Sequence, residues 1–269
     1  MPTTPAVPRP AATVLLVRDD PDPPPGRTPL QVFLQRRVAG MAFAGGMTVF
    51  PGGGVDSTDR PDTERWTGPD PAWWGVRLHC AADLAGALVH AAVRETFEEC
   101  GVLLAGPGPS GGLEQHRSDL VARRRTFPDL LADAGLVLRA DLLRPWARWI
   151  TPPGPPRRYD TAFFVALVPD GQEADAHTTE AVEATWWHPS DALEHWRAGD
   201  MQLMAPTFRT LQEIAEQPDS ASVLAAADGR VIRPITPQVR RDGEDVVVVL
   251  PDEPEVRLAG LSVPPERRA

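Results

Sequence analysis

The chain has 269 residues and a formal net charge of −10, an acidic balance that argues against general binding to nucleic acid or to anionic membranes. No apolar run approaches the 18 residues of a membrane-spanning helix, and the first residues lack the charged start and apolar core of a secretory signal. The two cysteines, Cys80 and Cys100, are too few for a disulfide framework. We therefore expect a cytoplasmic protein with free thiols and no membrane partner.

The first part of the chain predicts two strands. Residues 1–11 are rich in proline and alanine and are expected to be disordered. Apolar strands at residues 12–17 and 30–36 are separated by a proline-rich turn, so they are predicted to form a hairpin. Arg36 and Arg37 end the second strand.

A glycine-rich turn follows the hairpin. The apolar residues 47–50 lead into Pro51 and then Gly52, Gly53 and Gly54. Three glycines in a row let backbone amides and carbonyls approach a ligand closely.

Three carboxylates lie on one face of the next predicted element, a helix over residues 81–100. Glu95, Glu98 and Glu99 are spaced so that they lie one turn apart. Like charges at this spacing repel by about 0.2–0.5 kcal/mol per pair, and a hard divalent cation such as Mg²⁺ or Mn²⁺ would relieve the repulsion. A solvated acidic helix face is the alternative that these residues alone leave open.

The glycine turn and this helix resemble the Nudix box, G-x5-E-x7-R-E-U-x-E-E-x-G-U, where U is apolar. The motif positions are filled by Arg94, Glu95, Glu98, Glu99, Gly101 and Val102. Thr96 departs from the motif, because it stands where an apolar residue is expected. The interval from Gly53 to Arg94 is about 25 residues longer than in the standard box. The first Glu of the motif has no clean equivalent, and Asp56 or Asp59 is expected to replace it.

The extra residues, 56–80, form an insertion inside the box. Trp66, Trp73 and Trp74 lie in it. We expect these tryptophans to pack the insertion against the domain; a substrate lid or a dimer contact is the alternative.

The second half of the chain predicts, in order, helices in residues 113–134 broken at Pro128, strands at 145–151, 161–168 and 182–187, helices from 189 and at 205–217, and paired strands at 231–234 and 245–250. Strands on both sides of a central helix, with helices added later, fit a mixed α/β sandwich. The resemblance implies a Nudix-type α/β/α sandwich with a mixed β-sheet. We expect its domain to span residues 12–252, with a helical insertion at 113–144, an added helix at 200–217 and a loose tail at 253–269.

The resemblance also implies a set of metal ligands and catalytic groups. Glu98 and Glu99 would be the main ligands of Mg²⁺ or Mn²⁺, with Glu95 and the carbonyl of Gly52 in support. Arg94 precedes Glu98 by one turn, so an ion pair would fix that carboxylate. The cation would polarise a phosphoryl oxygen and activate the attacking water.

A further acidic residue is expected before the strand at 182–187, because Nudix enzymes often carry one ahead of a segment of the type E-A-x-W-x-x-P-x-x-A-L. Glu180 fits that pattern, Glu183 is the alternative, and an exposed loop carboxylate is the plainer interpretation. Either Glu95 or Glu180 would take the proton of the attacking water. Four arginines, in two adjacent pairs, are the candidates for binding substrate phosphate: Arg36, Arg37, Arg157 and Arg158.

The long box insertion and the segments at 151–161 and 201–208 resemble the peroxisomal-type acyl-coenzyme A diphosphatase branch of the Nudix family. The implied activity is hydrolysis of coenzyme A or acyl-coenzyme A to 3′,5′-ADP and 4′-phosphopantetheine, so the expected partner is a small nucleotide. ADP-ribose, NADH and nucleotide sugars are the alternative substrates. A catalytically silent nucleotide-binding module and a homodimer are two further options that the sequence leaves open.

Overall fold

The computed structural model describes residues 5–41, 44–60, 62–106, 113–176, 181–242, 245–250 and 256–258. Its strands are β1 (Arg9–Asp19), β2 (Leu30–Arg37), β3 (Thr48–Val49), β4 (Gly52–Gly54), β5 (Trp66–Thr67), β6 (Ala105–Gly106), β7 (Val137–Arg139), β8 (Arg144–Ile150), β9 (Tyr159–Leu167), β10 (Ala181–Trp187), β11 (Pro234–Ile235), β12 (Gln238–Asp242), β13 (Asp245–Val249) and β14 (Val256–Leu258). Its helices are α1 (Pro71–Leu78), α2 (Ala82–Cys100), α3 (Leu113–Val121), α4 (Phe127–Asp133), α5 (Pro189–Ala198), α6 (Ala205–Ala215) and α7 (Ser220–Gly229), with 3₁₀ turns η1 (Thr63–Arg65) and η2 (Ala140–Leu142).

A mixed sheet forms the centre of the molecule. Its strand order is β10-β2-β1-β9-β8-β11, with β3 paired to β2 and β4 paired to β1. Strand β1 runs antiparallel to β2, as the predicted hairpin requires, and parallel to β9. Side chains along β1 alternate between two cores, so that Val14 and Leu16 join one and Leu15 and Val17 join the other. A strand buried on both faces needs a layer on each side of the sheet.

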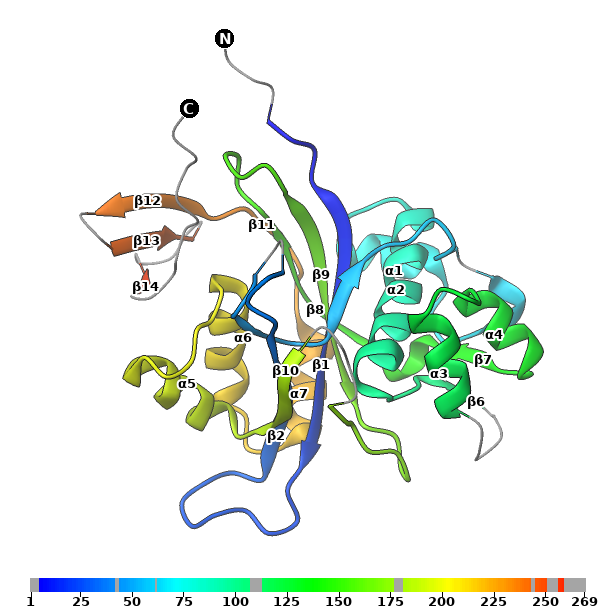
Figure 1. The fold of residues 1–269 in the computed structure, drawn as a ribbon, viewed down its shortest axis with the longest axis horizontal. Helices are drawn as coiled ribbons and strands as arrows, with labels where there is room; N and C mark the ends of the chain where they lie inside the picture. Colours follow the sequence, from blue (N-terminus) through cyan, green and yellow to red (C-terminus); the bar gives the residue numbers. More distant parts are fainter. Residues whose placement is uncertain are drawn as a thin grey trace.

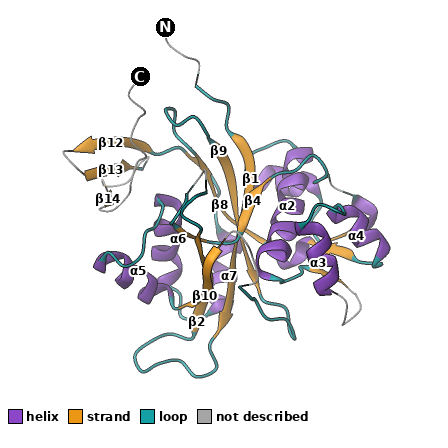
Figure 2. Ribbon diagram, in the orientation of Figure 1, coloured by secondary structure: helices purple, strands orange, loops and turns teal. Residues whose placement is uncertain are grey.

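Helices supply both layers (Figure 1). Helices α1 to α4 cover one face of the sheet and share its first core, and α5, α6 and α7 cover the other face and share its second core. The colouring by secondary structure makes the three layers visible, with the strands between two groups of helices (Figure 2). The predicted α/β/α sandwich with a mixed sheet is therefore confirmed.

Helix α2 is buried on nearly all sides, because it packs on the sheet and is also covered by other helices. Trp74 of α1, in the box insertion, and Phe127 of α4, in the helical insertion, belong to the same core as α2. It ends at Gly101, whose φ of 74° is left-handed and favours glycine. No single helix of the described residues is long and apolar enough to cross a membrane, and α1 with α2 meets that test only as a pair bent by 94°.

Some predicted elements differ from the structure. The strand pair 231–234 with 245–250 is wrong, because β13 pairs with β12 and β14 while β11 adds to β8. Strand β1 begins at Arg9, so residues 9–11 belong to the sheet and not to a disordered terminus. Strand β14 lies inside the predicted loose tail. Pro128 sits in the first turn of α4, so the break between helices precedes it.

Candidate active site

A glycine bend brings β4 against the first strand of the sheet. Gly52 pairs with Thr13, and a β-carbon at Gly52 would collide with the carbonyl oxygen of Ala12. Its φ of 155° also lies outside the range that L side chains readily adopt. The hydroxyl of Thr13 donates to the carbonyl of Pro51 at 2.6 Å and fixes the approach to the bend. The bend is therefore held in place by the sheet.

Glu99 joins the last turn of α2 to this bend. The amide of Gly52 donates to Glu99 Oε2 at 2.7 Å, and Gln35 on β2 donates its Nε2 to the same oxygen. The other amide atom of Gln35, Oε1, is buried without a hydrogen-bond partner among the described residues. The structure thus places the amide of Gly52 at the carboxylate; the predicted role of its carbonyl as a metal ligand stays a prediction.

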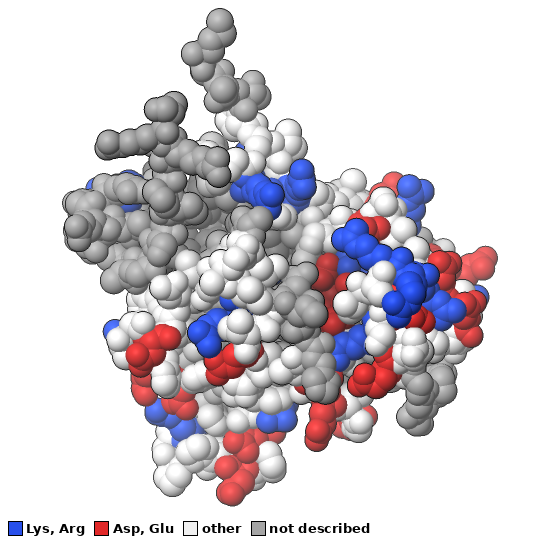
Figure 3. All heavy atoms as spheres, in the orientation of Figure 1, with Lys and Arg blue, Asp and Glu red and all other residues white. Residues whose placement is uncertain are grey.

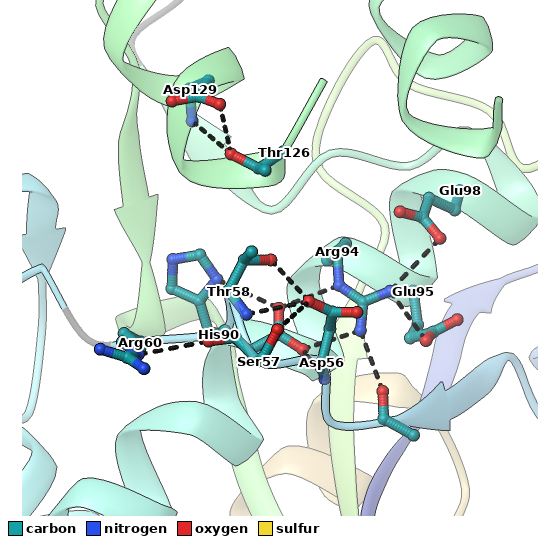
Figure 4. Close-up of polar contacts among 12 residues, drawn as sticks. Asp56, Ser57, Thr58, Arg60, His90, Arg94, Glu95, Glu98, Thr126 and Asp129 are labelled. Atoms are coloured by element: carbon teal, nitrogen blue, oxygen red, sulfur yellow. Dashed lines mark hydrogen bonds and ion pairs between the residues drawn. The ribbon is translucent and has the colours of Figure 1, made fainter. Parts of the chain in front are cut away.

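Arg94 lies between Asp59 on one side and the carboxylates of Glu95 and Glu98 on the other (Figure 4). Its Nε and Nη2 donate to the two carboxylate oxygens of Asp59 at 2.9 and 2.8 Å, and Nη2 also donates to the carbonyl of Gly54 at 3.0 Å. Its Nη1 faces Glu95 at 2.8 Å and Glu98 at 3.3 Å. The predicted ion pair between Arg94 and Glu98 is present, and the guanidinium orders Glu95 as well.

Asp59 and Asp56, the two candidates for the missing first Glu of the box, have different surroundings. The side chain of Asp59 is fully buried and makes the two-point contact with Arg94. Asp56 Oδ1 instead accepts from the amide and the hydroxyl of Thr58 at 2.9 Å, which is a local turn. Asp59 is therefore the residue that stands opposite the arginine of the box.

The surroundings of Thr96 show why a polar residue is tolerated at this apolar position of the motif. It is fully buried, and its hydroxyl donates to the carbonyl of Ala92, one turn earlier, at 2.7 Å. Because the hydroxyl is satisfied within the helix, the rest of the side chain packs as an apolar group would.

The pKa values of the three glutamates are raised, because burial disfavours their ionised forms. Burial and the neighbouring Glu95 raise the pKa of Glu99 to about 8, although hydrogen bonds from Gly52 and Gln35 act in the opposite direction. Burial raises the pKa of Glu95 to about 7 and raises the pKa of Glu98, both against the pull of Arg94. Burial also opposes the ionisation of Asp59, but His90 and Arg94 outweigh it and hold the pKa of Asp59 below its usual range.

This site fits a hard divalent cation. The three glutamates are oxygen donors of the type that Mg²⁺ and Mn²⁺ prefer, and a cation beside them would favour the ionised form that burial disfavours. The carboxylate of Glu95 packs directly against Gly53, where a β-carbon would collide with it. The glycine bend and the carboxylates therefore lie in contact. Within the described residues no three acidic, histidine or cysteine side chains already surround one point as ligands. Glu95 and Glu98 face Arg94 and would have to exchange it for the cation.

The predicted phosphate-binding arginines differ in their positions. Arg37 lies close enough to Glu99 that its charge acts to lower the pKa of that carboxyl. Arg36 of β2 pairs at 3.2 Å with Glu183, its cross-strand neighbour on β10, and both side chains are exposed. Arg158 donates to the carbonyls of Thr151 at 3.0 Å and Ala6 at 2.7 Å, which gives it a structural contact.

The structure does not place two of the predicted site residues at the acidic cluster. Arg157 is exposed in the loop between β8 and β9. Glu180 lies outside the described residues, so its predicted role as general base stays a prediction, and its alternative Glu183 is committed to Arg36.

Two residues near the site were not predicted from the sequence. Gln35 is a buried polar residue of β2 that stands between the apolar residues 32–34 and Arg36, and no sequence signal separates it from its polar neighbours. His90 lies on α2 one turn before Arg94, with Nδ1 3.6 Å from Asp59 Oδ1 and its ring 5.3 Å from that of Phe127. Its place between the charged pair and the helical insertion depends on the fold, so no local pattern marks it.

Comparison with solved structures fits this geometry. A structure described as a NUDIX hydrolase from Alicyclobacillus acidocaldarius superposes with a TM-score of 0.69 and 28% sequence identity, over 81% of this chain and 96% of that chain. The layers, the acidic turn of α2 and the glycine bend thus define a hydrolase of the Nudix class.

Sequence comparisons narrow the class. The family model of the NUDT19 Nudix domain matches residues 80–214. Putative nudix hydrolase 7 of Caenorhabditis elegans is 30% identical over 227 residues, which are 82% of this chain and 68% of that protein. Acyl-coenzyme A diphosphatase NUDT19 of Homo sapiens is 28% identical over 258 residues, covering 77% of this chain and 68% of that protein. The chain belongs to the Nudix hydrolase family, in the group described by the NUDT19 Nudix domain.

Proposed function

We propose that the protein hydrolyses the diphosphate of coenzyme A or acyl-coenzyme A with the help of a divalent cation. One observation carries the proposal: Glu99 and Glu95, in the last two turns of α2, lie against the β4 glycine bend, and Arg94 joins Glu95 and Glu98 to Asp59. Nudix hydrolases generally use divalent metal ions, and this cluster gathers carboxylate oxygens of the kind that such ions bind.

Glu98 and Glu99 are the main ligands in this proposal, with Glu95 in support. When bound there, Mg²⁺ or Mn²⁺ neutralises charge on the diphosphate and makes water a better nucleophile. Asp59 keeps Arg94 in position, so that Glu95 and Glu98 stay on the side of α2 that faces the bend. The amide of Gly52 and the side chain of Gln35 orient Glu99 in the same way.

The proton of the attacking water goes to Glu95 or Glu180. Glu95 is a candidate because it lies on α2 one turn before Glu98 and Glu99, next to the proposed ligands. Water then attacks one phosphorus of the diphosphate and the bridging P–O bond breaks. With coenzyme A the products are 3′,5′-ADP and 4′-phosphopantetheine.

The choice of coenzyme A rests on relatives. The human, Gallus gallus and Xenopus laevis proteins that match this chain are each named acyl-coenzyme A diphosphatase, at 28%, 28% and 22% identity. ADP-ribose, NADH and nucleotide sugars stay as alternative substrates, because they present the same diphosphate to the same carboxylates.

Product analysis tests the proposal. The protein is incubated with coenzyme A, ADP-ribose, NADH and nucleotide sugars, with Mg²⁺ or Mn²⁺, and the products are identified by mass spectrometry. We expect 3′,5′-ADP and 4′-phosphopantetheine from coenzyme A. Release of AMP from ADP-ribose alone would replace the substrate, and absence of products from every substrate would contradict the proposed activity. Glu99→Gln, which removes the charge at nearly constant shape, is expected to fold normally and to lose turnover.

A further inference from the structure

The helical insertion covers a buried histidine of α2. On the face drawn in Figure 3, basic and acidic side chains lie side by side on the right, where α3 and α4 lie in Figure 1. His90 is only 2% exposed, and its ring meets that of Phe127, the first residue of α4, edge to face at 5.3 Å. A histidine inside an apolar core needs a partner for its polar atoms. Neither the proposed ligands nor the proposed bases include His90.

The nitrogen Nδ1 of His90 lies close to the carboxylate of Asp59. The distance from Nδ1 to Asp59 Oδ1 is 3.6 Å, and this buried nitrogen makes no hydrogen bond of ordinary length among the described residues. A movement of about 0.5 Å would bring the two atoms to hydrogen-bond distance. His90 precedes Arg94 by one turn of α2, so both side chains lie on the same side of the helix (Figure 4). Asp59 therefore faces both of them.

The carboxylate of Asp59 has an acceptor position left for this donor. Each oxygen of an ionised carboxylate has two lone pairs. Oδ2 accepts from Arg94 Nη2 at 2.8 Å and from the amide of Asp56 at 2.7 Å, while Oδ1 accepts from Arg94 Nε at 2.9 Å. The side chain of Asp59 is fully buried, so solvent does not supply the fourth donor. A proton on His90 Nδ1 would complete the hydrogen bonding of the carboxylate.

Asp59 is the anchor of the arginine that orders the acidic turn. Arg94 contacts Asp59 and the carbonyl of Gly54 through Nε and Nη2. Its Nη1 contacts Glu95 and Glu98. The contacts to those two glutamates change if they bind a cation, so the contacts to Asp59 and Gly54 are the ones that hold Arg94 throughout. A donor that fixes Asp59 therefore also fixes Arg94.

We propose that His90 is a positioning residue of the active site: its Nδ1–H donates to Asp59 and thereby fixes Arg94 between the box insertion and the acidic turn of α2. This inference rests on the proposed function for the role of the acidic turn. Because Phe127 packs on the imidazole, the helical insertion supports the site through His90. The competing interpretation is a histidine that only fills the core. The two interpretations differ in the position of the ring proton and in the effect of an apolar replacement.

The first measurement locates the proton on the His90 ring. Long-range ¹H–¹⁵N spectra of the metal-free wild type distinguish a protonated from an unprotonated Nδ1 by chemical shift, and contacts with the Phe127 ring assign the signals. We expect Nδ1 of His90 to carry a proton. An unprotonated Nδ1 would overturn the inference, because that nitrogen could then only accept a hydrogen bond. The spectrum needs no variant, so it decides the contact even if a variant fails to fold.

The second measurement is the Mn²⁺ affinity of three variants by calorimetric titration. His90→Leu keeps an apolar body but removes the donor, and its affinity is expected to fall at least about fivefold. In His90→Asn the amide Nδ2 can take the place of the ring Nδ1, so the affinity is expected to stay within about twofold of the wild type. The matched control, Phe127→Leu, removes the ring partner but leaves the donor. It is expected to lower Tm and to keep an Mn²⁺ affinity within about twofold of the wild type.

Three results of the titrations would contradict the inference. They are equal affinity of His90→Leu and the wild type, equal losses in His90→Leu and His90→Asn, or a loss in Phe127→Leu as large as that in His90→Leu, which would assign the effect to core packing. If the wild type binds no Mn²⁺, the proposed function fails, while the position of the ring proton still decides whether His90 donates to Asp59.

Discussion

Asp59→Asn removes the buried carboxylate that receives two hydrogen bonds from Arg94. The side chain of Asp59 is fully buried and that of Arg94 is 10% exposed, so the guanidinium would lose its main counter-charge in a region that water barely reaches. Removing one partner of a buried ion pair costs about 3–5 kcal/mol of unfolding free energy. Asparagine keeps one acceptor oxygen, which places the expected loss near the lower end, about 3 kcal/mol.

Urea unfolding followed by circular dichroism measures this loss of unfolding free energy. On heating, a domain of this size that loses about 3 kcal/mol should show a fall in Tm of about 10 °C. Glu194→Gln is the matched control, because the pair of Arg27 and Glu194 is exposed and is expected to contribute less than about 1 kcal/mol. If Asp59→Asn were as stable as Glu194→Gln, Asp59 would not be the buried partner that organises Arg94.

Further predictions concern the carboxylates and the bend. Without metal, the folded protein should bind more protons than the unfolded chain between pH 5 and 8, because the pKa of Glu99 is raised to about 8 and that of Glu95 to about 7. Its unfolding free energy should therefore fall as pH rises through that range, by on the order of a few kcal/mol. Urea unfolding in EDTA should show a smaller fall for Glu99→Gln. Equal pH slopes for the variant and the wild type would refute the assignment of this pH dependence to Glu99. Gly53→Ala should displace the carboxylate of Glu95 and lower kcat at least about tenfold. The control is Gly54→Ala, which should keep a kcat close to that of the wild type because its β-carbon would lie 4.0 Å from its nearest neighbour. Equal rates for the two variants would contradict the contact between Gly53 and Glu95.

The parts of the site that lie within one element could be predicted from the sequence. Glu95, Glu98 and Glu99 share a helix turn, and helical spacing is enough to place them on one face. The glycine bend was found because its composition is unusual. Asp59 could not be separated from Asp56 in this way, because only the packing of the insertion decides which of the two faces Arg94.

Predictions of the fold failed where pairing joins distant segments or where a pattern is weak. The sequence around β11 and β13 predicts strands, but their partners β8 and β12 depend on the tertiary arrangement. Helix α7 was not predicted, because its sequence S-A-S-V-L-A-A-A-D-G has no clear apolar face. The insertion was expected to pack against the domain, and Trp74 does so with no exposed surface, while Trp73 on the same helix stays 40% exposed.

The central claim is that the acidic turn of α2 holds a divalent cation against the glycine bend. The most direct test is a calorimetric titration of Mn²⁺ into metal-free wild type and into Glu99→Gln. We predict saturable binding by the wild type and an affinity at least about tenfold weaker in the variant. Equal binding by the two proteins, or no binding by the wild type, would contradict the account.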